Sequence, residues 1–134
     1  MPRGVVLLAS LPLLILAGIV AAVSLLVPRE LDPARELMAF TGGDPARGKE
    51  MTRQKGCPTC HIIPGIAEAK GLVGPPLGHF ASRIYVGGVV PNTPDNLVAW
   101  IMDPPKIHPL SAMPATGVSE AEARDIAAYL YTLH

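Results

Sequence analysis

The two cysteines of this 134-residue chain lie close together in the stretch Gly-Cys-Pro-Thr-Cys-His. Cys57 and Cys60 have the spacing C-x-x-C, and His61 follows directly. Three chemistries use this spacing. A redox-active dithiol places it near a helix start in a βαβ unit. A structural zinc site uses it as half of a ligand set. A c-type haem forms thioether bonds to both cysteines and takes the next histidine as an iron ligand.

The rest of the chain favours the haem hypothesis over the other two. A redox dithiol does not need His61, and the sequence predicts no parallel strands. A zinc site needs two more ligands, and neither His79 nor His108 occurs in a paired ligand spacing. We therefore predict one haem c, bonded to Cys57 and Cys60, with His61 on its iron. The dithiol and zinc sites remain as alternatives.

A second axial ligand would have to reach the iron from a loop on the opposite side. Met113 lies in Pro-Leu-Ser-Ala-Met-Pro, a proline-framed loop between two predicted helices. A lone methionine is usually an apolar filler, but its thioether is also an iron ligand. Met51 and Met102 fall inside predicted helices, so we assign them to packing. The prediction is His61 and Met113 as the two ligands, with His79 and His108 as surface or structural residues.

Composition and charge limit the other function classes. The formal net charge is zero, so no strong field favours nucleic acid or an anionic surface. Aromatic residues make up 4%, while Pro (15) and Gly (13) are frequent. A core of this composition has few large side chains. It favours a small, loop-rich domain around something that supplies apolar volume, as a porphyrin would.

The first residues after the start form a long apolar segment. Residues 5–27 contain no charged side chain, and as a helix they would span roughly 34 Å, enough for a ~30 Å hydrocarbon core. A signal peptide has a shorter apolar region, of about 7–15 residues, although Val20-Ala21-Ala22 resembles a cleavage site. We predict an uncleaved transmembrane anchor over residues 1–28 and no nucleic-acid partner.

Capping signals place the helices that follow the apolar segment. Asp-Pro pairs predict helix starts for residues 33–40 and 45–54. Thr93 predicts a cap for a helix over residues 95–102, and Ser119 with Glu122 forms a capping box for a last helix. Residues 56–94 are rich in Gly and Pro and read as loops. The sequence predicts a partly helical linker over residues 29–43 and an all-α domain of three to four helices over residues 44–134.

Taken in order, these features make the chain resemble the small monohaem cytochromes c with an N-terminal haem site. The resemblance covers residues 43–133. Gly48 matches the small residue where the first and last helices cross, facing Ile126 and Tyr129, although Thr52 stands where the family often has an aromatic residue. The family also implies cofactor contacts: Pro75 through its carbonyl to His61, Arg83 and Ser111 near the propionates, and Trp100 in the helix before the methionine loop. The family's propionate-binding tryptophan, which precedes that helix, has no counterpart.

The resemblance implies an electron-transfer protein and not an enzyme, because both axial positions of the iron would be filled. It implies attachment of haem outside the bacterial cytoplasm, hence a single-pass inner-membrane protein with a periplasmic haem domain. The implied partners are a quinol-cytochrome c reductase, a terminal oxidase or both, with the protein possibly fixed in such a complex. The alternative is a haem-based sensor or peroxidase-like protein whose methionine ligand dissociates.

Overall fold

The computed structural model describes residues 3–26 and 33–134, and within the first range it describes the side chains of residues 12–23. The chain divides into two compact units, residues 1–32 and residues 33–134. The second unit holds all the residues singled out above for chemistry. Each unit is described by itself.

The first unit contains helix α1 (Arg3–Leu26), with Pro12 inside it. Its described side chains, at residues 12–23, are exposed. Among the residues whose side chains are described, no helix is both long enough and apolar enough to cross a membrane. The predicted span of residues 5–27 extends outside those residues at both ends, so it stays a prediction.

The second unit begins with α2 (Pro33–Thr41) and α3 (Pro45–Gln54). The side chain of Asp44 caps α3 by accepting hydrogen bonds from the N–H groups of Ala46 and Arg47, as the Asp-Pro signal predicts. The predicted linker, residues 29–43, contains α2, and this helix packs against the last helix of the domain and against α5 (Pro94–Met102). Its Thr41 is buried. Residues 33–41 therefore pack as part of the second unit.

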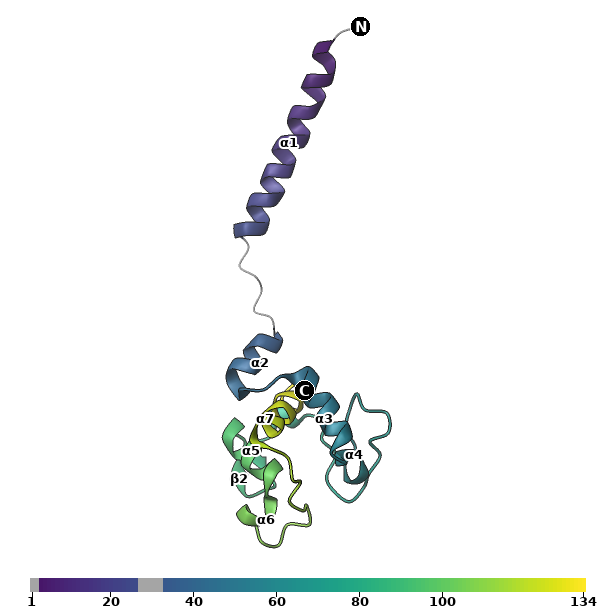
Figure 1. Cartoon of the computed structure of the whole chain (residues 1–134), viewed down its shortest axis with the longest axis vertical. Coiled ribbons are helices and arrows are strands. Elements are labelled where there is room, and N and C mark those ends of the chain that lie inside the picture. The colour runs from purple at the N-terminus through teal and green to yellow at the C-terminus, as the bar shows by residue number, and fades with distance from the viewer. Residues whose placement is uncertain (1–2, 27–32) are drawn as a thin grey trace. The chain divides into compact units, whose positions relative to one another are not determined.

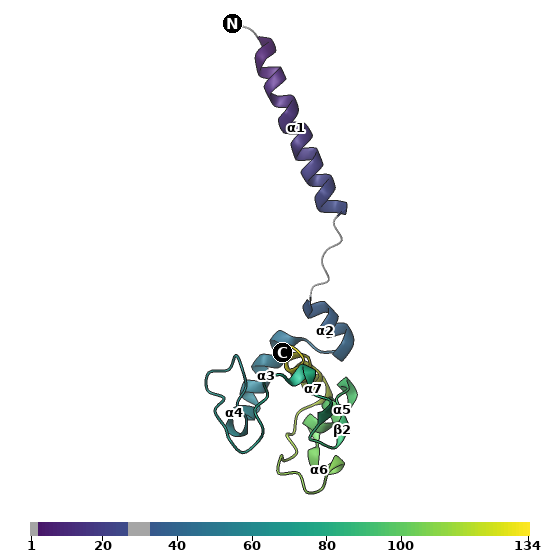
Figure 2. The same ribbon diagram turned by 180° about the vertical axis from the view of Figure 1, so that it is seen from behind.

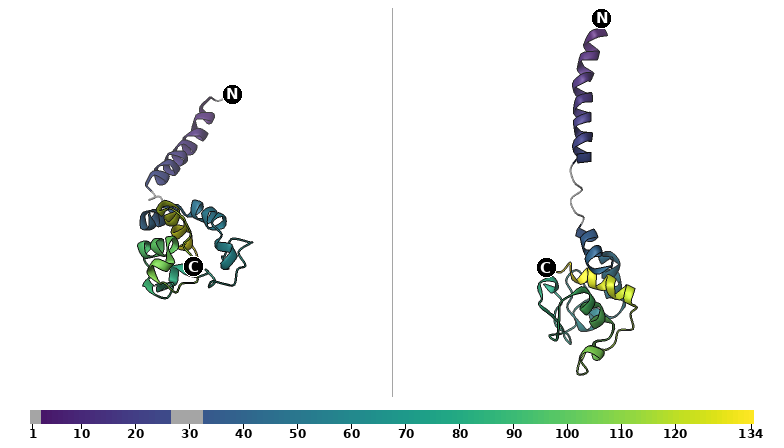
Figure 3. Two further views of the ribbon diagram at one scale, coloured as in Figure 1. Left: turned by 60° about the horizontal axis from the view of Figure 1, so that its bottom comes forward. Right: turned by 90° about the vertical axis from the view of Figure 1, so that its left-hand side faces the viewer.

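Helix α7 (Glu120–Leu130) lies across α3 and forms the closest helix pair of the domain (Figures 1 and 3). The predicted capping box is present, because Ser119 and Glu122 bond each other's backbone N–H groups. A Cβ added at Gly48 would overlap the backbone carbonyl of Asp125 and lie 3.0 Å from the Cβ of Tyr129. The predicted crossing at Gly48 is confirmed.

Buried polar groups stabilise the α3–α7 crossing through hydrogen bonds. The carboxylate of Asp125 accepts hydrogen bonds from the Asp44 N–H at 2.7 Å and from the Arg47 guanidinium at 2.9 and 3.0 Å. Burial of Asp125 opposes its ionisation, but these donors outweigh that effect, and the pKa of Asp125 is lowered. Thr52 is buried, and its hydroxyl donates to the Gly48 carbonyl at 2.7 Å.

The remaining longer helix is α5 (Pro94–Met102), capped by Thr93 as expected. Asp103 ends α5 and at once caps a short helix, α6 (Pro104–Ile107), which the sequence analysis did not predict. The long loop that follows returns to α5: the Thr116 hydroxyl donates to the Ile101 carbonyl at 2.7 Å and the Thr116 N–H to the Met102 carbonyl at 3.2 Å. Residues 103–116 thus form a closed loop on the end of α5 (Figure 2).

The segment between α3 and α5 is mostly loop, as predicted, with three short elements inside it. These are α4 (Cys57–Cys60), the 3-10 helix η1 (Phe80–Ser82), and an antiparallel hairpin of β1 (Tyr85–Val86) and β2 (Val90–Pro91). The hairpin departs from the all-α prediction. Its two strands are only two residues long, so no alternating pattern could reveal them. The predicted helical class holds for the rest of the domain.

Candidate functional site

A large cavity of the described domain lies between the α4 loop and the α5–α6 side of the domain. Its volume is about 400 Å³, within the range of small-molecule and cofactor sites. Apolar side chains dominate its wall. All eight residues predicted as cofactor contacts line it: Cys57, Cys60, His61, Pro75, Arg83, Trp100, Ser111 and Met113. The fold therefore brings together segments that are more than fifty positions apart in sequence.

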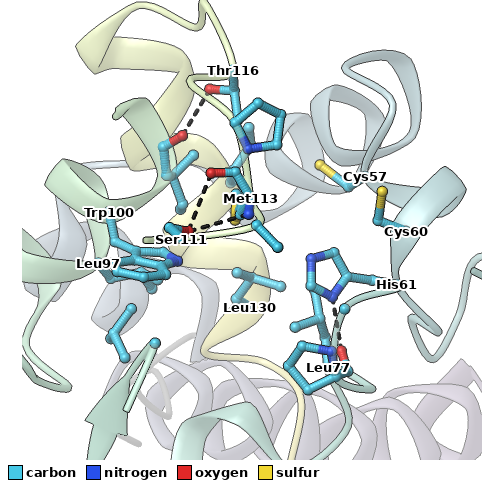
Figure 4. A pocket seen from close by; sticks show the side chains of 18 of the residues that line it. Cys57, Cys60, His61, Leu77, Leu97, Trp100, Ser111, Met113, Thr116 and Leu130 are labelled. Carbon is cyan, nitrogen blue, oxygen red and sulfur yellow. Dashed lines mark hydrogen bonds between the residues drawn. The ribbon is translucent and has the colours of Figure 1, made fainter. Parts of the chain in front are cut away.

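The cysteine side of the cavity is built by α4. Gly56 precedes it with a left-handed conformation, and the N–H of His61 closes the turn on the Cys57 carbonyl at 3.0 Å. Both thiols are free and half-buried, and their sulfur atoms lie on the same side of the pocket (Figure 4). Burial raises the pKa of the Cys57 thiol. A reactive dithiol needs the opposite shift.

His61 is held in one orientation by the backbone. Its Nδ1–H donates to the Pro75 carbonyl at 2.7 Å, which leaves the lone pair of Nε2 free for a metal. The turn that supplies this carbonyl comes close to the ring: a Cβ at Gly74 would lie 2.6 Å from His61 Nδ1 and 2.8 Å from Nε2. Only glycine leaves room here for the imidazole. Pro75 thus lies where the resemblance implies, bonded to the histidine.

Met113 reaches the cavity from the loop on the other side (Figure 4). The hydroxyl of Ser111 accepts from the Met113 N–H at 3.1 Å and lies 3.2 Å from its carbonyl oxygen, so a tight local turn fixes the backbone of the methionine. By contrast, Met51 and Met102 pack against the core, as predicted. The arrangement places an imidazole and a thioether in one cavity, from separate segments.

Arg83 extends along the cavity and contacts neighbouring backbone. Its guanidinium donates to the carbonyls of Pro76 and Gly78, the latter at 3.3 Å, and lies 5.1 Å above the Phe80 ring. Burial lowers the pKa of Arg83. A cation at this wall suits an anionic group of an occupant. Trp100, from α5, lines the cavity on the Met113 side.

Two surrounding residues or groups of residues gain a definite place in the structure. His108, predicted as a surface or structural residue, is half-buried and lines the cavity. In the apolar stretch after His61, Ile63 and Ile66 are core residues, 2% and 6% exposed. Val73 and Leu110 are large apolar residues that line the cavity and are exposed, and the exposed Leu72 precedes Val73 in the chain.

The donor set of the described residues gives the zinc alternative no support. There, no three side chains of His, Cys, Asp or Glu come together as metal ligands. A covalent haem fits better: two adjacent thiols, a histidine with one free nitrogen, a thioether and an apolar cavity are the groups that it requires. A fold of helices around such a pocket defines a class of electron-transfer protein.

The sequence places the chain in that class. The profile of the family described as "Cytochrome c" matches residues 45–134, and the chain therefore belongs to the cytochrome c family. It is a c-type cytochrome, an electron carrier, and Cys57, Cys60 and His61 form its haem attachment motif.

Two curated proteins are similar to this domain. "Cytochrome c oxidase subunit 2" of Alkalihalophilus pseudofirmus is 32% identical over 88 residues, which are 65% of this chain and 25% of that protein. "Cytochrome c oxidase subunit 2" of Bacillus subtilis is 31% identical over 87 residues, 63% of this chain and 24% of that protein. The chain thus matches about a quarter of the length of these relatives. The likeness links it to respiratory redox proteins.

Proposed function

We propose that this protein is a membrane-anchored cytochrome that carries single electrons on the periplasmic side of a bacterial inner membrane, between a quinol-oxidising complex and a terminal oxidase. The observation that supports it most is the convergence of Cys57, Cys60, His61 and Met113 on one apolar cavity. Cys57 and Cys60 would hold one haem covalently. His61 and Met113 would bind its iron.

The chain's own residues would tune this site for electron transfer. When bound, haem supplies a reversible one-electron couple, and His/Met ligation raises its potential. The Pro75 carbonyl fixes the His61 ring, and the Ser111 turn fixes the Met113 backbone, so both ligands are positioned before an electron arrives. The apolar wall excludes water. With both axial positions occupied by protein, no substrate would bind directly to the iron.

An apolar rim beside the cavity supports a lasting partner. Leu72, Val73 and Leu110 are 83%, 75% and 87% exposed, and Val73 and Leu110 also line the cavity. The net charge of zero provides no strong steering field for a diffusing shuttle. In the two relatives a similar segment is part of a longer chain named as an oxidase subunit. We therefore favour a fixed position beside a terminal oxidase.

The absorption spectrum tests the ligand assignment. Met113→Leu removes the thioether while keeping apolar volume, so haem should stay attached while the methionine-to-iron band disappears. Carbon monoxide should then bind to the reduced variant. Met102→Leu is the matched control, because Met102 packs against the core, and it should keep the band. A wild-type protein that binds carbon monoxide readily would favour the sensor alternative instead.

Fractionation tests the anchor. A 23-residue apolar segment is not released by charge screening, so the protein should stay in membranes at high salt and need detergent for extraction. Its N-terminal sequence should begin at or near Met1. A mature N-terminus near Val23 would contradict the anchor and leave a periplasmic soluble cytochrome.

Co-purification in mild detergent tests the partner. We expect a terminal oxidase to remain with the wild-type protein. The apolar rim is supported as the interface if the oxidase separates from a Leu72→Asp, Leu110→Asp variant whose haem spectrum is unchanged. Equal oxidase reduction rates by anchored and released forms would favour a diffusing shuttle, because release lowers the local concentration.

A further inference from the structure

The β1–β2 hairpin contacts the cofactor cavity at a place that the proposed electron-transfer function does not explain. Its Val86 is buried, and both Val86 and Gly87 line the cavity. At Gly87 the backbone comes so close to Trp100 that an added Cβ would overlap the indole, lying 2.5 Å from Cζ2 and 2.7 Å from Cζ3. The hairpin therefore presses backbone against the six-membered ring of Trp100.

This contact limits the position of the indole on one side, because the Gly87 backbone occupies the adjoining space. Trp100 is a half-buried residue of α5, and β1 packs on that helix. A ring held by packing moves when one of its walls moves.

The base of the hairpin is anchored to the rest of the domain. The Asn92 N–H donates to the Ile84 carbonyl at 2.8 Å and closes the hairpin. The side-chain amide of Asn92 donates to the carbonyls of Phe80 and Arg83, and its oxygen accepts from the Tyr131 hydroxyl at 2.9 Å. The hairpin is thus tied to Tyr131, the residue that directly follows α7, and can act as a stiff support.

On its other side Trp100 faces the methionine loop. Trp100, Ser111 and Met113 line the same side of the cavity (Figure 4). The loop is fastened to α5 directly after Trp100, through the bonds of Thr116 to Ile101 and Met102. The indole therefore lies on the same side of the cavity as the loop segment that contains Met113, close to where that loop is fastened to α5.

We infer that the hairpin is a positioning element for Met113, acting through the contact of Gly87 with Trp100 and so setting the strength of the methionine–iron bond. This inference rests on the proposed ligation by Met113. Trp100 and Gly87 are positioning residues, since they act through the methionine.

The test uses two neighbouring glycines of the haem-loaded full chain. Gly87 and Gly88 both have positive φ, 58° and 74°, so alanine is strained at either position. Only at Gly87 would the new Cβ meet Trp100, because nothing lies within 4 Å of a Cβ at Gly88. Gly87→Ala should weaken the methionine–iron band, lower the reduction potential and raise the affinity of added imidazole about tenfold, which corresponds to about 1.4 kcal/mol of lost support. Gly88→Ala should leave the methionine–iron band, the reduction potential and the imidazole affinity as in the wild type.

A second variant shows whether the indole carries the effect. Trp100→Phe removes the ring atoms that Gly87 touches and weakens the wall, so it should also lower the potential. In the Trp100→Phe background, Gly87→Ala and Gly88→Ala should change the reduction potential equally, because the indole atoms that the Gly87 Cβ would overlap are gone. Equal shifts from the two glycine variants would overturn the inference and point to hairpin strain.

The outcomes separate this inference from the proposed ligation. A wild-type spectrum without the methionine–iron band would overturn both. A normal wild-type band, with Gly87→Ala and Trp100→Phe both at the wild-type potential and imidazole affinity, would overturn only the role of the hairpin.

Discussion

The α3–α7 crossing and the cofactor cavity are both built around a glycine, but they use it differently. At the crossing, Gly48 lets the backbone of one helix touch the backbone of another, and protein atoms fill both sides of the contact. In the cavity, Gly74 makes room for the His61 ring, and about 400 Å³ lies between this wall and the Met113 loop. At the crossing, protein atoms pack against each other, whereas the cavity walls would pack against a bound cofactor.

This difference separates stability from coordination. The crossing is closed by Asp125, which bonds Asp44 and Arg47, and by the buried Thr52. The cavity ligands are each held by one or two local bonds, those of His61 to Pro75 and of Met113 to Ser111. We therefore expect changes at the crossing to alter unfolding, and changes at the cavity wall to alter the spectrum and the potential.

The largest effect should come from Gly48→Ala. By helix propensity alone this change would stabilise α3 by up to about 1 kcal/mol, but the Cβ overlaps the Asp125 carbonyl and forces the helices apart. We expect the free energy of unfolding to fall by about 3 kcal/mol, measured by urea denaturation of the haem-loaded protein. Lys49→Ala, at the exposed neighbouring position, is the control and should change it by less than about 0.5 kcal/mol. Increased stability of Gly48→Ala would contradict the close crossing.

Gly74→Ala should act on coordination first. Its Cβ would take the space of the imidazole, so the ring must turn and its bond to Pro75 is lost. We expect a changed haem spectrum, with a loss of unfolding free energy of about 1–2 kcal/mol. Gly78→Ala is the control, because its Cβ would lie 3.5 Å from Pro64 Cγ, an ordinary contact. A Gly74→Ala variant that keeps the native haem spectrum while folded, but unfolds much more easily, would contradict the expectation that the cavity wall controls coordination and the crossing controls stability.

A smaller effect depends on pH and involves α7. Glu122 accepts from the Lys55 ammonium at 2.7 Å and from the Ser119 N–H and hydroxyl, and these bonds lower its pKa to about 2. A carboxylate with a lowered pKa stabilises the fold above its ordinary pKa of 4.5, and that contribution is lost as the pH falls from there toward about 2.

Unfolding measured at several pH values checks this expectation. Glu122→Gln should flatten the dependence of stability on pH in the interval between pH 4.5 and 2. Lys55→Ala should flatten part of the same interval, and adding it to Glu122→Gln should produce little further change. An unaltered pH profile in Glu122→Gln would show that the capping box does not depend on the charge.

The smallest effect should come from Pro75→Ala. The group that holds His61 is the backbone carbonyl, which alanine keeps. The variant should lose about 0.5 kcal/mol through the greater freedom of its unfolded chain, with an unchanged spectrum and potential. Unfolding of the whole domain by this change would mean that the proline ring itself supports the cavity wall.

Local signals in the sequence identified most of the helices and the haem attachment motif. The caps at Asp44, Thr93 and Ser119 lie where they were predicted, because capping needs only a few neighbouring residues. The motif of Cys57, Cys60 and His61 indicated haem attachment for the same reason. By contrast, α6 was missed because Pro104 and Pro105 also read as a stop, although proline is equally common in a first helical turn.

The other features of the fold and the cavity depend on packing between segments that are distant in sequence. No local sequence pattern connects such segments. The sequence alone determined the chemistry of attachment and the starts of the helices, through side chains that act on their own neighbours. Only the tertiary structure decided that Ile63 and Ile66 are buried, that His108 turns into the cavity and that Trp100 rests on Gly87. It also decided that α2 belongs to the domain. A contact between distant segments depends on how the whole core fills space, and a residue's own type and spacing do not carry that information.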